Sequence, residues 1–207
     1  ISEYTSIPAT TVYRILHLDL KYQIKHLKLV PHLLNPSQKV SRIELSKSLL
    51  KTIQTAKHYK FEYFYTGDES WFYLLTDHKI MCLPPDEIPP FIEKKTKYSK
   101  KFMLTIFWNI NGFPIVEILP DGEKFTAEYF VNNILQSLNQ IAPQNRNRKL
   151  VLHYDNARPH TSRKVNRYLD ENRMKRAPQP PYSPDIAPSN FFLFGYIKSK
   201  LNGQHFD

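Results

Sequence analysis

With 207 residues, 41% of them hydrophobic and 14% aromatic, the chain is long enough for one domain of about 150 residues plus a smaller piece, and it is not composed like a disordered tail. The formal net charge of +10 indicates a polyanionic partner, although a basic protein without a nucleic-acid role is the alternative on charge alone. The single cysteine, Cys82, excludes a disulfide framework and a cysteine-based zinc site.

The first predicted element is a short turn followed by a helix within residues 1–18. Ser6 is placed to cap this helix, and Pro8 falls near its first turn, where a missing N–H group has no effect. An apolar face follows, made of Val12, Ile15 and Leu16. Because so short a helix does not fold alone, we expect partner helices upstream of Ile1; an ordinary surface helix is the alternative.

A basic segment and a second helix come next. The segment carries Lys21, Lys25, His26 and Lys28. Asn35-Pro36 is typical of a helix start, with Asn35 as the cap and Pro36 in the first turn. We expect this helix to turn four apolar residues inward, namely Val40, Ile43, Leu50 and Ile53. Three cations are expected to point outward, namely Arg42, Lys47 and Lys51.

From about Phe61 the pattern changes to aromatic-rich strands. Phe61–Tyr65 and Trp71–Leu75 are predicted as two strands. A hairpin with an Asn-Gly turn is predicted from Phe102–Trp108, Asn111-Gly112 and Pro114–Leu119. Thr126 is placed to cap a helix with one apolar face, made of Phe130, Val131, Ile134, Leu135 and Leu138.

The C-terminal part alternates again. Leu150–Tyr154 is predicted as a short strand, followed by a helix over about residues 162–172 and a proline-rich loop over 178–188. A last helix begins near Pro188 and is expected to bury Phe191, Phe192, Phe194 and Ile197. Antiparallel strands, a helix, another strand and further helices indicate a mixed α/β sheet.

Two aspartates occupy positions at which a carboxylate needs a partner. Asp68 lies inside or just after the first apolar strand, and Asp155 follows the strand Leu150–Tyr154. A carboxylate at the end of a buried strand is unfavourable unless it is paired, and a divalent cation is one such partner. If the two strands are neighbours, two carboxylates and one further oxygen donor suffice to hold Mg²⁺ for phosphoryl transfer. Turn or capping roles are the alternative.

Several blocks of the sequence resemble those of mariner-type transposases in order and spacing. Three of them resemble the family's catalytic blocks, namely residues 66–71 (TGDESW), 153–160 (HYDNARPH) and 181–189 (PYSPDIAPS). Residues 30–34 (VPHLL) resemble the family's linker motif, and Ser6–Leu16 is similar to the end of its second helix-turn-helix.

The resemblance implies an α/β, RNase H-like mixed sheet flanked by helices, preceded by the end of a helix-turn-helix and a helical linker. On this basis residues 1–20 are assigned to the helix-turn-helix, 21–58 to the linker and 59–207 to the catalytic domain. Because the chain begins at Ile1 and not at Met, we expect further segments of the protein outside it.

The resemblance also implies a set of catalytic, metal-binding residues. Asp68 and Asp155 match the family's first two catalytic aspartates, and Asn190 stands where the family has a third acid. An asparagine carbonyl can contact a metal, but it carries no charge and cannot act as a base.

Neighbouring side chains offer alternatives to this set. Asp185 accompanies the third acid in the family and does not replace it. Direct metal ligation by His153 or His160 is a further alternative, although the family's metal ligands are carboxylates. Asn156 is placed to orient a catalytic carboxylate, to contact phosphate or to serve in a turn.

For function, the resemblance implies a transposase that uses Mg²⁺ or Mn²⁺, cuts DNA at the terminal inverted repeats of a transposon and joins the ends to target DNA. It also implies a homodimer in the nucleus. No apolar run approaches the roughly 18–20 residues that span a bilayer, and the N-terminus lacks a signal-peptide pattern, so no membrane is expected.

Basic residues around the expected site predict contact with DNA. They form three groups: Lys94, Lys95, Lys97, Lys100 and Lys101; Arg146, Arg148 and Lys149; and Arg163, Lys164, Arg167, Arg173, Lys175 and Arg176. Because of Asn190, the rival interpretation is a catalytically weakened or domesticated DNA-end-binding protein. A transcription regulator built on the N-terminal helices is a third.

Overall fold

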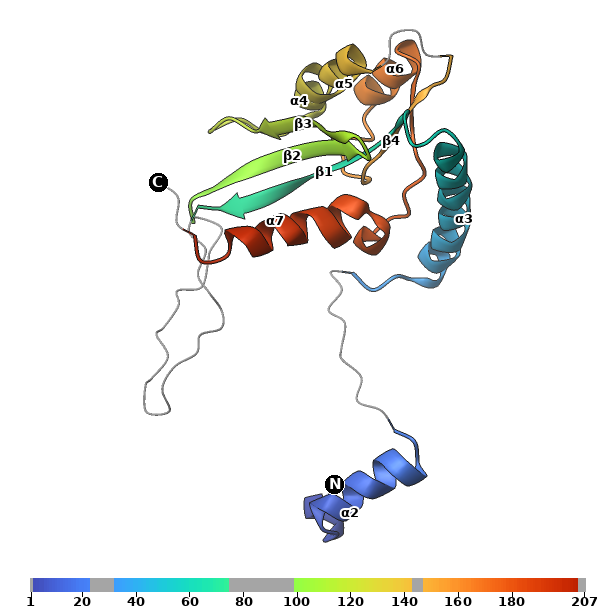
Figure 1. The fold of residues 1–207 in the computed structure, drawn as a ribbon, viewed down its shortest axis with the longest axis vertical. Coiled ribbons are helices and arrows are strands. Elements are labelled where there is room, and N and C mark those ends of the chain that lie inside the picture. The colour runs from blue at the N-terminus through green and yellow to red at the C-terminus, as the bar shows by residue number, and fades with distance from the viewer. Residues whose placement is uncertain (1, 23–31, 75–98, 143–146, 205–207) are drawn as a thin grey trace. The chain divides into compact units, whose positions relative to one another are not determined.

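A computed structural model describes residues 2–22, 32–74, 99–142 and 147–204 (Figure 1). The chain divides into two compact units, Ile1–Leu33 and Leu34–Asp207, which are described separately. The unit that carries the sheet thus includes helix α3 (Pro36–His58), which the family resemblance assigns to the linker. The basic residues at 25–28 and the lysines at 94–97 lie outside the described residues.

The N-terminal unit contains the predicted helix but not the predicted cap. α1 (Ser2–Thr5) is a single turn, and α2 (Ala9–Arg14) continues into the π-helical turn η1 (Ile15–Asp19). The N-cap of α2 is Pro8, which has no capping side chain. Ser6 lies two residues earlier with a left-handed φ of 55°, so the prediction that it caps the helix is wrong.

Helix α3 begins where the sequence predicts, because Asn35 closes a capping box. Its Oδ1 accepts from the N–H of Gln38 at 2.8 Å, and Gln38 Oε1 accepts from the N–H of Asn35 at 2.9 Å. The two bonds satisfy backbone donors that a helix start otherwise leaves unpaired.

The predicted inward face of α3 is wrong except for Ile53. Three of its members, Val40, Ile43 and Leu50, are each more than half exposed. The buried residue is Leu49, which packs with Phe64 and Ala177, and Ile53 packs against this cluster one turn later. Seven apolar positions spread around a long helix are compatible with two faces, and contact with the sheet selects one.

A five-stranded sheet in the order β3-β2-β1-β4-β5 forms the centre of the second unit (Figure 1). The strands are β1 (Phe64–Tyr73), β2 (Lys101–Asn109), β3 (Gly112–Ile118), β4 (Leu150–His153) and β5 (Met174–Arg176). β1 pairs antiparallel with β2 and parallel with β4, so the predicted mixed sheet is confirmed. The prediction of two strands within 61–75 is wrong, because β1 is continuous, and β5 was not predicted.

The predicted hairpin and the predicted Thr126 cap are present. Gly112 has a φ of 140° in the turn between β2 and β3, a conformation that favours glycine. Thr126 Oγ1 accepts from the N–H of Tyr129 at 3.1 Å and caps α4 (Ala127–Tyr129). This helix continues through η2 (Phe130–Leu135) into α5 (Gln136–Ile141). Ser162 caps α6 (Arg163–Glu171) in the same way.

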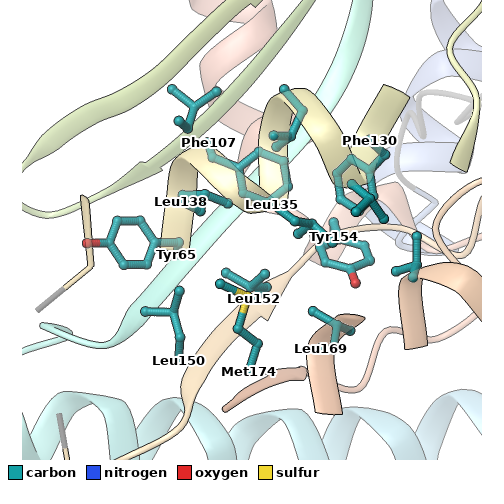
Figure 2. Packing of buried hydrophobic residues seen from close by; sticks show 14 of the residues in the cluster. Tyr65, Phe107, Phe130, Leu135, Leu138, Leu150, Leu152, Tyr154, Leu169 and Met174 are labelled. Atoms are coloured by element: carbon teal, nitrogen blue, oxygen red, sulfur yellow. The ribbon is translucent and has the colours of Figure 1, made fainter. Parts of the chain in front are cut away.

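Helices cover both faces of the sheet. α4, α5 and α6 lie on one side and α7 on the other (Figure 1). The larger core lies under the first group, where side chains of β1, β2 and β4, among them Tyr65, Phe107 and Leu152, pack with Phe130 and Leu138 (Figure 2). On the opposite face, Phe72 and Ile106 pack with Leu193 and Phe194. The alternation of neighbouring residues between the two cores is the two-residue period of a strand.

The C-terminal helix buries only part of its predicted face. After the short helix η3 (Pro184–Ile186), η4 (Ser189–Leu193) leads into α7 (Phe194–Leu201). Phe194 is buried and Ile197 packs beside it, as predicted. Phe191 and Phe192 are more than half exposed, so the prediction for these two is wrong. None of the helices in the described ranges is long and apolar enough to cross a bilayer.

Gly67 has a structural role in β1 that can be tested by substitution. It pairs with Phe107 on β2, and a Cβ atom at Gly67 would lie 2.4–2.5 Å from the Phe107 ring. Phe107 is fully buried, so the ring has no free space to move into. We expect Gly67→Ala to lower the free energy of unfolding by about 1–3 kcal/mol, measured by urea denaturation.

Gly195 provides the matched control, because a Cβ atom added there meets nothing within 4 Å. Gly195→Ala lies in α7 and should stabilise the protein by roughly 0.5–1 kcal/mol. Adding Phe107→Leu to Gly67→Ala should recover part of the loss. If both glycine variants unfold at the same urea concentration, the contact with Phe107 is not limiting.

Candidate active site

Asp68, Asp155 and Asn190 line one cavity of about 510 Å³. Asp68 lies in the middle of β1, Asp155 lies just beyond the end of β4, and Asn190 lies in η4. The parallel register of β1 and β4 pairs Thr66 with His153. Both aspartates are two residues beyond this pair, so adjacent strands carry them to the same place. The predicted proximity of the two carboxylates is confirmed.

Asp68 is buried and already has two hydrogen-bond donors. The N–H of Glu69 donates to its Oδ1 at 2.9 Å, and the Asn190 side-chain amide donates to its Oδ2. Burial, followed by the negative charges of Glu69 and Asp155, raises the pKa of Asp68 to about 7. A carboxylate with so raised a pKa gains from a nearby cation, which compensates for the water that it has lost.

Asp155 is held by a buried histidine. His160 Nδ1 donates to Asp155 Oδ1 at 2.8 Å, and the N–H of Ala157 donates to the same oxygen at 2.9 Å. Burial acts to raise the pKa of Asp155, but the His160 hydrogen bond and the Ala157 N–H outweigh it and lower the pKa. No described residue donates to Asp155 Oδ2, so this oxygen remains available in the cavity.

His160 links Asp155 to Glu69. The ring is fully buried and packs at a centroid distance of 4.5 Å from Phe130. Its Nε2 lies 3.3 Å from Glu69 Oε2, an ion-pair contact that is not aligned as a hydrogen bond. Burial acts to lower the pKa of His160, but the bond to Asp155 and the contact with Glu69 prevail and raise it to about 9. The imidazolium therefore holds two carboxylates, and this role of Glu69 was not predicted from the sequence.

His153 and Asn156 both contact Gln179, in the loop that follows β5. His153 Nε2 lies 2.8 Å from Gln179 Oε1 and its Nδ1 lies 3.3 Å from Thr66 Oγ1. Since both of its ring nitrogens have hydrogen-bond partners, His153 is not placed as a metal ligand. In His160, Nδ1 is bonded to Asp155 and Nε2 faces Glu69, so this ring is placed to hold carboxylates. Asn156 Nδ2 donates to the carbonyl of Gln179 at 2.7 Å, which supports a structural role for Asn156.

Asp185 lies outside the cavity lining and is paired elsewhere. Arg42 on α3 donates to its two oxygens at 3.0 and 2.7 Å, and to Ser183 Oγ at 2.6 Å. The prediction that Arg42 points outward is therefore wrong. Because Ser183 lines the cavity, this bidentate contact joins α3 to the loop that borders the carboxylates.

The side-chain oxygens of Asp68, Asp155 and Asn190 suit a hard divalent cation, although they carry fewer negative charges than three carboxylates would. Two carboxylates and one amide oxygen are ligands that Mg²⁺ and Mn²⁺ accept, with water in the remaining positions. Asn190 turns its amide N–H toward Asp68, so a bound cation requires the amide to rotate and present its oxygen. Within the described ranges, no three residues of the types His, Cys, Asp and Glu are grouped to hold a metal.

The raised pKa of Asp68 predicts how stability changes with pH when metal is removed by EDTA. An unfolded aspartate ionises near pH 3.8, whereas Asp68 in the folded protein keeps its proton to about pH 7. The folded state binds more protons in this window, so its stability should fall as pH rises from about 4 to about 7 and should not fall further from this cause. Urea denaturation across pH 4–8 measures the effect.

Asp68→Asn provides the comparison, because it removes the titrating group and keeps its shape. The difference in unfolding free energy between the two proteins should change across pH 4–7 and then level off. A difference that is independent of pH would show that Asp68 titrates normally in the folded protein.

Comparison with known proteins identifies related sequences. The family described as Transposase (partial DDE domain) matches residues 77–152. The human histone-lysine N-methyltransferase SETMAR is 34% identical over 216 residues, which cover 100% of this chain and 30% of SETMAR. The mariner Mos1 transposase of Drosophila mauritiana is 32% identical over 188 residues, which cover 86% of this chain and 53% of the transposase. The chain thus spans about half of Mos1 transposase and less than a third of SETMAR.

Solved structures agree with these relatives. The Mos1 strand transfer complex matches with a TM-score of 0.80 and 26% identity, covering 100% of this chain and 60% of that one. The Mos1 mariner paired end complex with Mn matches with a TM-score of 0.78, 27% identity and coverages of 100% and 61%. The Mos1 catalytic domain matches with a TM-score of 0.62, 28% identity and coverages of 86% and 78%. The predicted RNase H-like fold is confirmed.

Proposed function

Because the chain belongs to the mariner-type transposase family, we propose that it carries the catalytic site of a cut-and-paste DNA transposase. The reaction is metal-dependent phosphodiester cleavage at transposon ends, followed by transfer of those ends to target DNA. The observation that carries the proposal is the meeting of Asp68, Asp155 and Asn190 in one cavity. These three are the proposed catalytic and metal-binding residues.

The side chains of the cavity have separate tasks in this mechanism. Mg²⁺ or Mn²⁺, when bound, would activate the attacking hydroxyl and stabilise the departing oxygen in an in-line displacement. Asp68 and Asp155 Oδ2 would hold the cation, with Asn190 Oδ1 as the neutral third ligand. His160 orients Asp155 by holding its other oxygen, and Asp68 is buried in β1.

The substrates and assembly follow from the same proposal. The solved Mos1 complexes are named as paired end and strand transfer complexes, one of them with Mn. For this chain we propose terminal inverted repeats and target DNA as substrates, a homodimer as the assembly and the nucleus as the compartment, because genomic DNA is there.

A second function is supported by Asn190. Replacement of the third acid by an amide is the change expected of a weakened or domesticated DNA-end-binding protein. The chain also matches 30% of a protein named as a histone-lysine N-methyltransferase, which supports a domain of this kind as one part of a larger protein with another named activity.

One assay separates the two functions. The full-length protein is incubated with uncleaved and with pre-cleaved transposon ends, in Mg²⁺, in Mn²⁺ and in EDTA. The transposase proposal expects metal-dependent nicking and strand joining, stronger in Mn²⁺. Binding of the ends without a product in either metal would favour the DNA-end-binding function.

A further inference from the structure

A second cavity lies at the opposite end of the parallel strands from the carboxylates. It has a volume of about 470 Å³ and is bounded by the second half of α3 and the starts of β4 and β5. Its lining contains four cations, Lys51, Arg148, Lys149 and Lys175, and no acidic residue. We refer to it as the basic cavity.

The four cations of the basic cavity are free to bind an anion. In the part of the chain that the structure describes, none of them forms an ion pair. All four side chains are exposed. The hydroxyls of Thr52 and Thr55, which also line the cavity, donate to carbonyl groups of their own helix, so the cations are the groups that would face a ligand.

Residues 147–150, which include Arg148 and Lys149, are held in place. The Arg148 guanidinium lies 3.5 Å from the centroid of the Tyr59 ring on the C-terminal side of α3. Arg173 donates to the carbonyl of Asn147 at 3.2 Å, and the N–H of Leu150 donates to the carbonyl of Arg173. A stacked guanidinium keeps its N–H donors available, so less conformational entropy is lost on binding.

These observations point to a phosphate backbone as the ligand. The cations come from three separate parts of the chain and remain in contact with solvent. This arrangement suits binding to the surface of a large ligand better than enclosure of a small molecule. Arg148 already covers Tyr59, so this ring is not free to stack on a base. Recognition would therefore depend on charge, which is how proteins hold duplex DNA without reading its sequence.

The distance to the carboxylates fits the same ligand. Phe64 and Val151 line the basic cavity and are paired in the β1–β4 register, and each lies four residues before a catalytic aspartate. Four residues of strand span about 13 Å. A duplex with one phosphodiester at the carboxylates carries on the order of eight phosphate charges over that length.

We propose that the basic cavity is a second phosphodiester-binding site, which holds the backbone of duplex DNA outside the bond that is cleaved. The site rests on the proposed DNA substrate but does not require cleavage. It adds affinity and position without contributing to sequence recognition.

The test is the salt dependence of DNA binding in EDTA. The anisotropy of a fluorescent 30-bp duplex is measured with the wild type, with the cavity variant Arg148→Gln/Lys149→Gln/Lys175→Gln, and with the control variant Lys39→Gln/Lys47→Gln/Lys124→Gln. The control removes three exposed cations that do not line the cavity. Each lost phosphate contact lowers the slope of log K against log salt by about 0.9, so the cavity variant should lose about 2–3 and the control less than 1.

Four further measurements make the result decisive. Melting temperatures show whether each variant is folded, and Arg148→Lys, which keeps the charge, should retain the wild-type slope. Equal slopes in the cavity and control variants would overturn the proposal. The proposal would also be overturned if millimolar inorganic phosphate stabilised the wild type but not the cavity variant, while the two proteins had equal salt slopes for duplex binding. The ligand would then be free phosphate. Nicking by the same proteins is measured separately. If the cavity variant nicks DNA and its salt slope equals that of the wild type, only the proposal for the basic cavity is refuted. If the cavity variant has a lower salt slope but the wild type does not nick DNA, only the transposase function is refuted.

Discussion

Asn190→Asp should increase metal-dependent nicking of uncleaved transposon ends by about a hundred- to several-thousand-fold, the equivalent of about 3–5 kcal/mol in the activation free energy. An amide at position 190 leaves the proposed metal-binding set, Asp68, Asp155 and Asn190, one negative charge short of three carboxylates. A cation held opposite a phosphate should bind more weakly there, and both activation of the attacking hydroxyl and stabilisation of the leaving oxygen depend on it.

The same substitution should change stability in opposite directions with and without metal. In the metal-free protein Asn190 donates to Asp68 Oδ2, whereas a carboxylate at 190 would add a third negative charge beside Asp68 and Asp155. The melting temperature of Asn190→Asp in EDTA should therefore lie below that of the wild type. Its gain on adding Mn²⁺ should be larger, because a cation relieves the added repulsion.

Joining of pre-cleaved ends should gain less than nicking, because bound DNA already positions the attacking 3′-hydroxyl. Full-length wild type, Asn190→Asp and Asn190→Ala are compared on both substrates. Equal nicking rates for the three proteins would show that position 190 is not the third ligand, and Asp185→Asn would be the next variant to assay. An inactive Asn190→Asp would favour the DNA-end-binding function.

Asp68→Ala and Asp155→Ala should each abolish nicking and the stabilisation by metal. A ligand that binds only the folded state at a hundred times its Kd adds about 2.7 kcal/mol to stability. This increment should be present in the wild type and absent from both variants, and thermal unfolding with Mn²⁺ or EDTA measures it. Asp121→Ala, which removes an exposed carboxylate outside the cavity, should behave as the wild type.

Asp155 requires a second variant, because its removal also affects His160. Asp155→Ala leaves the buried imidazolium with Glu69 alone, so the protein should already be less stable in EDTA. Asp155→Asn keeps an acceptor for His160 Nδ1 and should retain more of that stability, although it should also lose the response to metal. A full Mn²⁺ response in Asp68→Ala and in Asp155→Asn would refute the shared metal site.

Local signals in the sequence predict most element boundaries. Asn35 and Thr126 cap helices as predicted, since a cap depends on a hydroxyl or amide and the next three residues. The Asn111-Gly112 turn fixes its hairpin for a similar reason. Features of this kind depend only on residues a few positions apart in the sequence.

Features set by distant contacts were missed. Phe61–Tyr65 and Trp71–Leu75 are predicted as separate strands, but Gly67 packs closely against Phe107 and β1 continues through it. The three-residue strand β5 exists because β4 pairs with it. The same holds in the site: the two aspartates could be selected from the sequence, whereas the contact of His160 with Glu69 depends on how β1 meets the loop after β4.

The sequence separation of the cavity residues determines when the cavity can form during synthesis. Asp68 and Asn190 are 122 residues apart in the sequence, and ribosomes add about 5–20 residues per second. Asp68 therefore leaves the ribosome roughly 6–24 s before Asn190, with β4 and the His160 loop emerging in between. A nascent chain cannot assemble the proposed catalytic site until η4 is available, so we expect products of a premature stop between Asp155 and Asn190 to carry both aspartates and not to cut DNA.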